Sequence, residues 1–316
     1  MNFLRKLLKG DKRIIAQTIS AVENDSDTQI MEKIFPYTGH AYRVGITGPP
    51  GAGKSTLVNV IAKTLLNKDK KVGIIAVDPT SPFSGGALLG DRVRMNDLAL
   101  NENAFIRSMA SRGSLGGLAQ KTKDAALVLD ASGMDYVLIE TIGVGQVELD
   151  IAQVCDTIVV VLVPESGDSI QAMKAGLLEI ADIIVVNKGD REGCDRFVME
   201  LKFSLELRKH EAGWHFPILK TIATEEKGIE KLVLIMETHQ DYLMKSGKFA
   251  EERKAKLKLR INELIEEKIK LHVMENIVKE HELNAIVDKI YKRKLNPYAV
   301  ANRIAKSIIK PHNRQK

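Results

Sequence analysis

A glycine-rich segment at residues 48–56, GPPGAGKST, has the spacing of a loop that binds nucleotide phosphates. It follows an apolar run typical of a strand and precedes a run typical of a helix. Glycine lets successive backbone N–H groups face phosphate oxygens, and the helix N-terminus adds the positive end of its dipole. Lys54 would reach the β- and γ-phosphates, and Ser55 would offer its hydroxyl to Mg²⁺. The predicted nucleotide-binding residues of this loop are Gly48, Gly51, Ala52, Gly53, Lys54, Ser55 and Thr56.

A second motif, NKGD at residues 187–190, follows an apolar run downstream of this loop. In that setting the carboxylate of Asp190 can accept hydrogen bonds from N1–H and from the exocyclic amine of guanine. Adenine presents a different donor and acceptor pattern at that edge, so a site built for guanine rejects it. GTP is therefore the predicted substrate. The predicted base-binding residues are Asn187, Lys188 and Asp190, with Thr221 and Ala223 at the end of the next apolar run.

Carboxylates that could hold Mg²⁺ lie between these two motifs. Asp78 and Glu140 each end a predicted strand, and the carboxyl ends of parallel strands form the edge of a sheet where ligands bind. Asp91 lies in a long polar segment, residues 78–95, of the kind that usually carries function. Asp78 could instead cap a turn before the proline that follows it. The predicted metal ligands are Ser55, Asp78, Asp91 and Glu140, and the predicted catalytic residues are Lys54, Glu140 and Asp91.

The segment that follows Glu140 lacks the glutamine that orients the attacking water in Ras-like enzymes. It reads ETIG rather than the common DxxG pattern, and Val144 follows the glycine. Without an obvious residue to orient that water, basal GTP hydrolysis should be slow. Slow hydrolysis suits a switch. Three polar segments could sense the γ-phosphate: residues 79–95, 143–148 and 167–174.

Seven short runs rich in apolar and β-branched residues alternate with helical patterns from residue 42 onward. Several are almost continuously apolar, which is typical of strands buried on both faces of a parallel sheet. The predicted fold class is α/β, a P-loop NTPase with a doubly wound, mostly parallel sheet. The predicted strands are residues 42–47, 71–77, 104–108, 135–140, 157–163, 182–186 and 216–221.

Helical patterns flank this α/β region on both sides. Residues 1–40 are predicted to form an N-terminal helical extension, residues 41–246 the P-loop GTPase domain, and residues 247–316 a C-terminal helical arm. In the arm, apolar residues recur at helical spacing from Leu257 to Val273 and give one apolar face. That face must be buried either on the rest of the chain or on a second subunit, and we expect a homodimer formed through the arm.

The composition is that of a folded globular protein, with 44 % hydrophobic and 28 % charged residues among 316. Its two cysteines are far apart and have no partners at metal-binding spacing, so neither a disulfide framework nor a zinc site is expected, and a cytoplasmic location fits. No apolar run approaches the roughly 20 residues of a membrane span. The first residues favour an amphipathic helix over a targeting signal.

The net charge of +6 is concentrated in the C-terminal arm. From residue 247 onward there are about 18 Lys and Arg residues against about 9 Asp and Glu residues. Such a segment could attract RNA, acidic lipid or an acidic protein. However, its basic residues alternate with glutamates and lack the aromatic side chains on which bases stack. A solvated helical surface is therefore the favoured interpretation, and nucleic acid is not an expected partner.

Five segments taken together resemble a known family: GPPGAGKST, AVDPTSPFSGGALLGDRVRM, ETIGVGQVE, PESGDSIQAMKAG and VVNKGD. In this order they are similar to the MeaB/ArgK-type P-loop GTPases, and the likeness covers essentially the whole chain. The resemblance implies a homodimeric GTPase chaperone that gates cofactor loading of an adenosylcobalamin-dependent acyl-CoA mutase and protects that enzyme. The client would be methylmalonyl-CoA mutase or a close relative. The resemblance also implies that Asp168 and Lys174 belong to an additional switch segment, and Gly189 stands where a side chain such as Ala is common.

Two other functions use the same kind of phosphate loop. A metallochaperone GTPase for nickel-enzyme maturation would carry a histidine tract or a CxxC motif, whereas the seven histidines here are scattered and the two cysteines are isolated. A small-molecule kinase would need an acceptor pocket rather than a guanine-reading motif. The mutase chaperone is therefore the leading prediction, with the metallochaperone as its alternative.

Overall fold

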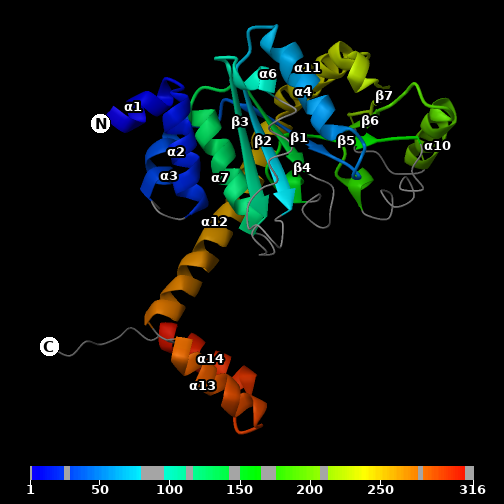
Figure 1. Cartoon of the computed structure of the whole chain (residues 1–316). Helices are drawn as coiled ribbons and strands as arrows, with labels where there is room; N and C mark the ends of the chain where they lie inside the picture. The colour runs from blue at the N-terminus through cyan, green and yellow to red at the C-terminus, as the bar shows by residue number, and fades with distance from the viewer. Residues whose placement is uncertain are drawn as a thin grey trace. The chain divides into compact units, whose positions relative to one another are not determined.

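The computed structural model describes residues 2–24, 29–79, 96–111, 117–141, 150–164, 176–206, 213–276 and 280–309. Within these ranges, the centre of the molecule is a seven-stranded sheet with the order β3-β2-β4-β1-β5-β6-β7 (Figure 1). Every neighbouring pair of strands is parallel. The strands are β1 (Tyr42–Thr47), β2 (Val72–Pro79), β3 (Ala104–Ser111), β4 (Tyr136–Thr141), β5 (Thr157–Leu162), β6 (Ile183–Val186) and β7 (Ile218–Lys220).

All seven predicted strands are present, and the predicted α/β class with a parallel sheet is confirmed. The apolar runs became strands because a central position in the sheet buries both of their faces; every residue of β4, β5 and β6 is buried. Strands β2 and β3 are longer than predicted because their last residues, Pro79 and Ser111, pair with each other. Strand β7 is shorter than predicted, and it lies at the edge of the sheet with β6 as its one neighbour.

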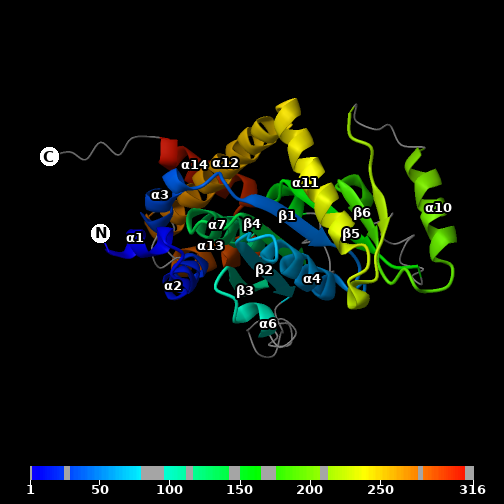
Figure 2. The same cartoon turned by 90° about the horizontal axis from the view of Figure 1, so that it is seen from above.

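Helices cover both faces of this sheet (Figures 1 and 2). One apolar core joins a face of the sheet to α1, α2, α3, α7 and α10, and a second core joins the other face to α4 and α11. This is the doubly wound arrangement, in which crossover helices pack on both sides of parallel strands. The helices are α1 (Asn2–Leu8), α2 (Lys12–Glu23), α3 (Gln29–Ile34), α4 (Lys54–Leu66), α6 (Asn96–Ala99), α7 (Gly117–Ala131), α10 (Cys194–Glu206) and α11 (Ile229–Ser246), with short 3₁₀ turns at η1 (Phe35–Tyr37), η2 (Ile151–Gln153), η3 (Leu177–Glu179) and η4 (Ala223–Glu225).

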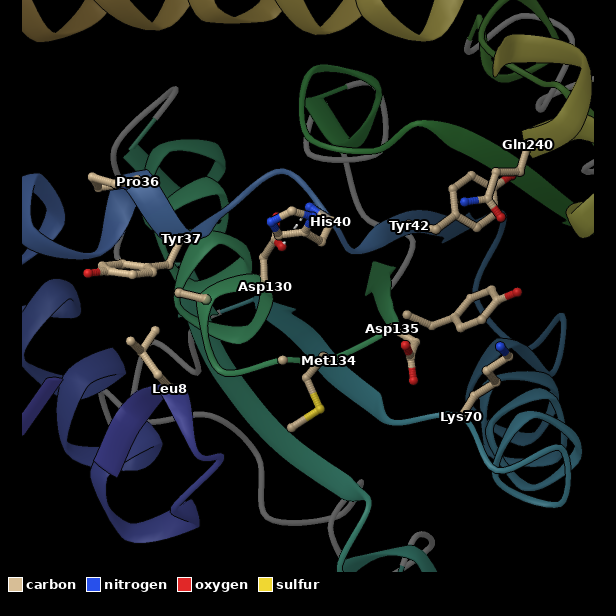
Figure 3. Close-up of a pocket in the computed structure, with 13 residues that line it drawn as sticks. Leu8, Pro36, Tyr37, His40, Tyr42, Lys70, Asp130, Met134, Asp135 and Gln240 are labelled. Carbon is tan, nitrogen blue, oxygen red and sulfur yellow. Dashed lines mark hydrogen bonds between the residues drawn. The ribbon is translucent and has the colours of Figure 1, made fainter. Parts of the chain in front are cut away.

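One buried carboxylate holds the segment that leads from the N-terminal helices into the sheet. Asp130, at the end of α7, accepts hydrogen bonds from the backbone N–H groups of Gly39, His40 and Ala41, and it pairs with Arg43 of β1 at 3.1 Å. These contacts fix the path of the chain from η1 into β1. Asp130 and His40 lie together in a cavity of about 610 Å³ near the amino ends of β1 and β4 (Figure 3).

The chain divides into two compact units, Met1–Glu252 and Arg253–Lys316. The division falls inside the helix α12 (Lys248–Asn276) rather than at its start, since Phe249 in its first turn packs against the second core of the sheet. The remaining helices of the second unit are α13 (Glu280–Tyr291) and α14 (Pro297–Ile309).

The apolar stripe of α12 is open to solvent in the single chain. Leu257, Ile261, Ile265 and Ile269 keep between 44 % and 57 % of their surface exposed. Four large apolar residues exposed at helical spacing are typical of a surface that another element covers. Among the described residues, no helix has the length and apolar character that a membrane crossing requires.

Candidate functional site

The phosphate loop lies between the carboxyl end of β1 and the start of α4, and two of its glycines cannot carry a side chain. A Cβ at Gly48 would lie 2.1 Å from the carbonyl oxygen of Val161, and φ there is 144°. A Cβ at Gly53 would lie 2.5 Å from Nδ2 of Asn187, with φ at 85°. L-residues rarely adopt such φ values, so glycine is required for the loop to pass this close to β5 and to the NKGD segment. The backbone geometry therefore matches the predicted phosphate-binding loop.

Lys54 begins α4 and points back over the loop. Its Nζ atom donates hydrogen bonds to the carbonyl oxygens of Gly48 at 2.8 Å and Pro49 at 2.9 Å, and only 5 % of the residue is exposed. The ammonium group is thus held within the loop by two carbonyl dipoles, at the place where phosphate oxygens would lie when nucleotide binds.

Ser55 and Glu140, two of the predicted Mg²⁺ ligands, lie next to each other. The Ser55 hydroxyl donates to Oε1 of Glu140 at 2.6 Å, and Glu140 is 1 % exposed at the end of β4. The register that pairs Ile46 of β1 with Glu140 brings the two residues to the same edge of the sheet. A hydroxyl and a carboxylate are oxygen ligands of the kind that Mg²⁺ prefers, so the residues present fit this ion.

Asn187 connects the phosphate loop to the second motif. Its Nδ2 donates to the carbonyl oxygen of Ala52 at 2.9 Å, while its Oδ1 accepts from the Thr221 hydroxyl and from the Ala223 backbone N–H, both at 3.1 Å. All four residues are buried. The Asn187 side chain therefore links the three loops that follow β1, β6 and β7.

A cavity of about 220 Å³ opens beside this amide, between the two motifs. Four of the five residues predicted to bind the base line it: Asn187, Lys188, Asp190 and Ala223; the fifth, Thr221, bonds to Asn187 and is not part of the lining. Ile222, between the two predicted residues Thr221 and Ala223, also lines the cavity, and the sequence analysis missed two further lining residues, Arg191 and Thr224. Their positions directly after Asp190 and directly after Ala223 were the signal that could have identified them. The cavity has one end at Gly53 and Thr56, so it adjoins the phosphate loop.

Four predicted site residues have side chains outside the part of the chain that the structure describes: Asp78, Asp91, Asp168 and Lys174. The backbone of Asp78 pairs with Ala110 in β3, which puts this residue at the same sheet edge as Glu140. Asp91, Asp168 and Lys174 fall outside the described residues, as do most of the three segments predicted to sense the γ-phosphate. In the part of the chain that the structure describes, no group of three or more His, Cys, Asp and Glu side chains could hold a metal ion.

The chain is similar to several known proteins. Residues 15–278 match the family model described as methylmalonyl-CoA mutase-associated GTPase MeaB. A protein of Pyrococcus abyssi is 47 % identical over 311 residues, which are 97 % of this chain and 96 % of the relative. GTPase ArgK of Escherichia coli is 36 % identical over 284 residues and 86 % of each chain. The mouse methylmalonic aciduria type A homolog, mitochondrial, is 32 % identical over 304 residues, 95 % of this chain and 72 % of the relative.

A solved structure described as LAO/AO transport system kinase has the same fold. It covers 98 % of this chain and 97 % of its own, with a TM-score of 0.72 and 28 % sequence identity. The phosphate loop identified in the sequence is of the kind that nucleotide-hydrolysing enzymes use. This chain therefore belongs to the MeaB family of methylmalonyl-CoA mutase-associated GTPases.

Proposed function

We propose that the protein is a Mg²⁺-dependent GTPase chaperone that gates cofactor loading of an adenosylcobalamin-dependent acyl-CoA mutase and protects that enzyme. The observation that carries the GTPase chemistry is the meeting of Lys54, Ser55 and the buried Glu140 at one sheet edge. The observation that supports the client is the family to which the chain belongs, whose description names methylmalonyl-CoA mutase. The same family match favours this function over nickel-enzyme maturation.

In this proposal each part of the site has one task. Lys54 leaves the Gly48 and Pro49 carbonyls and neutralises charge on the β- and γ-phosphates, which is the main means of catalysis in phosphoryl transfer. Ser55 and Glu140 hold Mg²⁺, with Asp78 and Asp91 as the further ligands. When bound, the ion supplies positive charge to the phosphate oxygens. Asp190 selects guanine over adenine.

A magnesium titration of GTP hydrolysis tests the role of Glu140. Glu140→Gln keeps the size of the side chain and its ability to accept from Ser55, but it removes the negative charge. The Mg²⁺ concentration needed for half-maximal hydrolysis should rise by more than the dissociation constant for GTP does. Equal changes in the two quantities would show that Glu140 acts on nucleotide binding rather than on the metal.

The client is tested by a GTPase assay with and without the cognate mutase. If a mutase binds the GTP and GDP states of this protein with different affinities, linkage requires that mutase binding also changes the affinity of the protein for the two nucleotides. We expect the mutase to accelerate hydrolysis, and Lys174→Ala to reduce this acceleration more than it changes basal turnover. Lys245→Ala is the matched control, because Lys245 pairs with Asp241 on the surface of α11. Absence of stimulation by any cobalamin-dependent mutase of the same source would refute the client.

The exposed stripe of α12 supports a homodimer as the working form. Burial of Leu257, Ile261, Ile265 and Ile269 against a second copy would remove their apolar surface from water, which is favourable. Ile265→Glu places a charge in the stripe and should give a monomer in sedimentation experiments. Lys270→Glu introduces the same charge elsewhere on the helix and should leave the dimer intact. A wild-type monomer at micromolar concentration would overturn the dimer.

A further inference from the structure

A second cavity, of about 390 Å³, lies away from the nucleotide site, near the amino ends of β6 and β7. Its walls come from the segment around η3, the end of α10, the segment that leads into β7, the last turns of α11 and the first turn of α12. All of its lining residues belong to the first compact unit. The GTPase chemistry described above uses none of them.

One wall of this cavity is a cluster of aromatic rings. Trp214 and His239 have ring centroids 4.4 Å apart, and Trp214 and Tyr242 have centroids 5.4 Å apart. The indole N–H of Trp214 donates to the carbonyl oxygen of Asp182 at 2.9 Å, which fixes the indole in the wall. Phe216 completes the aromatic lining. The faces of aromatic rings carry partial negative charge, so such a wall attracts cations.

The charged residues of the lining also favour a cation. The acidic residues of the lining are Glu179, Asp182 and Glu252, and its one lysine is Lys248; Oδ2 of Asp182 also accepts from the Ile158 backbone N–H at 2.8 Å. His239 adds no positive charge at neutral pH, because burial and the nearby Lys248 lower its pKa to about 4. Its Nδ1 atom is engaged by the Thr157 hydroxyl at 2.7 Å. The lining therefore carries more negative than positive charge.

Lys248 already places a cation against this wall. Its Nζ atom lies over the ring of Tyr242, 5.8 Å from the ring centroid. That distance is within the range at which an ammonium group is attracted to an aromatic face. Lys248 is the first residue of α12 and lines the cavity, so its ammonium group is a cation that the chain itself holds at one side of the cavity.

From the aromatic wall, the carboxylates and the tethered ammonium together, we infer that this cavity is a binding site for an organic cation, an alkylammonium or guanidinium group. The cation would lie on the faces of Trp214 and Tyr242 and be balanced by Glu179 and Asp182. Lys248 would compete with it for Tyr242. The same chemistry could come from a free small molecule or from a basic side chain of another protein, and these two sources are distinguished by the probe.

Trp214 provides the readout, because it is the one tryptophan of the chain and lies in the cavity wall. Its fluorescence is followed in the full-length protein during titration with arginine methyl ester, and separately with the peptide Gly-Gly-Arg-Gly-Gly. NaCl at the same ionic strength and a peptide with citrulline in place of arginine are the controls. A saturable change with the ester shows that a free cation suffices, and a saturable change with the arginine peptide alone assigns the site to a protein side chain.

Three variants test the assigned contacts. Tyr242→Leu should weaken binding by about 3- to 30-fold because it removes one aromatic face, whereas Tyr242→Phe keeps the face and should bind within about twofold of wild type. Lys248→Met should tighten binding several-fold, since the tethered competitor is gone. The proposal is overturned if neither probe gives a change beyond that of NaCl, if the citrulline peptide binds as well as the arginine peptide, or if Tyr242→Leu and Lys248→Met both leave the affinity unchanged.

Discussion

Asp130 should be among the most sensitive polar residues of the fold. It is 2 % exposed and accepts four hydrogen bonds: Oδ1 from the N–H groups of His40 and Ala41, and Oδ2 from the N–H of Gly39 and the guanidinium of Arg43. In Asp130→Asn, one of the two oxygens becomes an NH₂ group, which cannot accept. Whichever oxygen is replaced, two donors lose their acceptor, and the Arg43 charge loses its partner.

The size of the effect follows from these contacts. A hydrogen bond to a charged group is worth about 1.5–3 kcal/mol, and buried donors without an acceptor add to the cost. Two lost bonds therefore predict a fall of about 3–6 kcal/mol in the free energy of unfolding. Asp135→Asn is the matched control in the same region of the chain. Asp135 is exposed, and its carboxylate accepts one bond, from the Lys71 N–H at 2.7 Å, which the amide oxygen of Asn can still accept, so we expect a loss below about 1 kcal/mol.

Urea unfolding followed by circular dichroism measures both variants. A shift in the midpoint without a change in slope would be read as a change in stability alone. Asp130 lies at the amino end of β1 and the phosphate loop at its carboxyl end, so the folded fraction of Asp130→Asn should bind GTP with wild-type affinity. If Asp130→Asn and Asp135→Asn lose the same free energy, the reasoning from burial and bond count is wrong. A selective loss of GTP affinity would show that the two ends of the strand are coupled.

Further predictions concern the nucleotide site and pH. Lys54→Ala should abolish GTP hydrolysis, because the group that neutralises the phosphates is gone; phosphate release at wild-type rate would mean that another lysine fills the role. Gly53→Ala should weaken GTP binding at least tenfold, since its Cβ would lie 2.5 Å from Nδ2 of Asn187, and isothermal titration calorimetry measures this. Asp190→Asn should weaken GTP and admit xanthosine triphosphate, and comparable affinities of the wild type for ATP and GTP would contradict a guanine reader. The pKa of His239 is about 4 in the folded protein against 6.5 ordinarily, so the unfolded state binds the proton first. Stability should be complete above about pH 6.5 and fall by about 3 kcal/mol towards pH 4, and His239→Gln should flatten that part of the profile in urea midpoints measured across pH.

The fold could be predicted from the sequence because its strands are buried on both faces and so have nearly continuous apolar runs, as in β4 and β5. The phosphate loop could be predicted because its glycines, lysine and serine are adjacent in the chain. The Asn187 tether could not, since Ala52, Thr221 and Ala223 are far from it in sequence and polar contacts between distant loops leave no periodic pattern. The cation-binding cavity was missed for the same reason, because Asp182, Trp214 and Tyr242 come from three separate elements.

The Asn187 tether also has a thermodynamic consequence. One amide side chain links the base cavity to the phosphate loop. A ligand that orders one of these two sites therefore also orders part of the other, and a second ligand loses less conformational entropy when it binds there. Guanosine and pyrophosphate, added as separate molecules, should therefore bind with positive cooperativity even though no covalent bond joins them. The gain of intact GTP over its fragments also contains the effect of its own covalent link, so the cooperativity between the two separate fragments is the quantity that measures coupling through the tether.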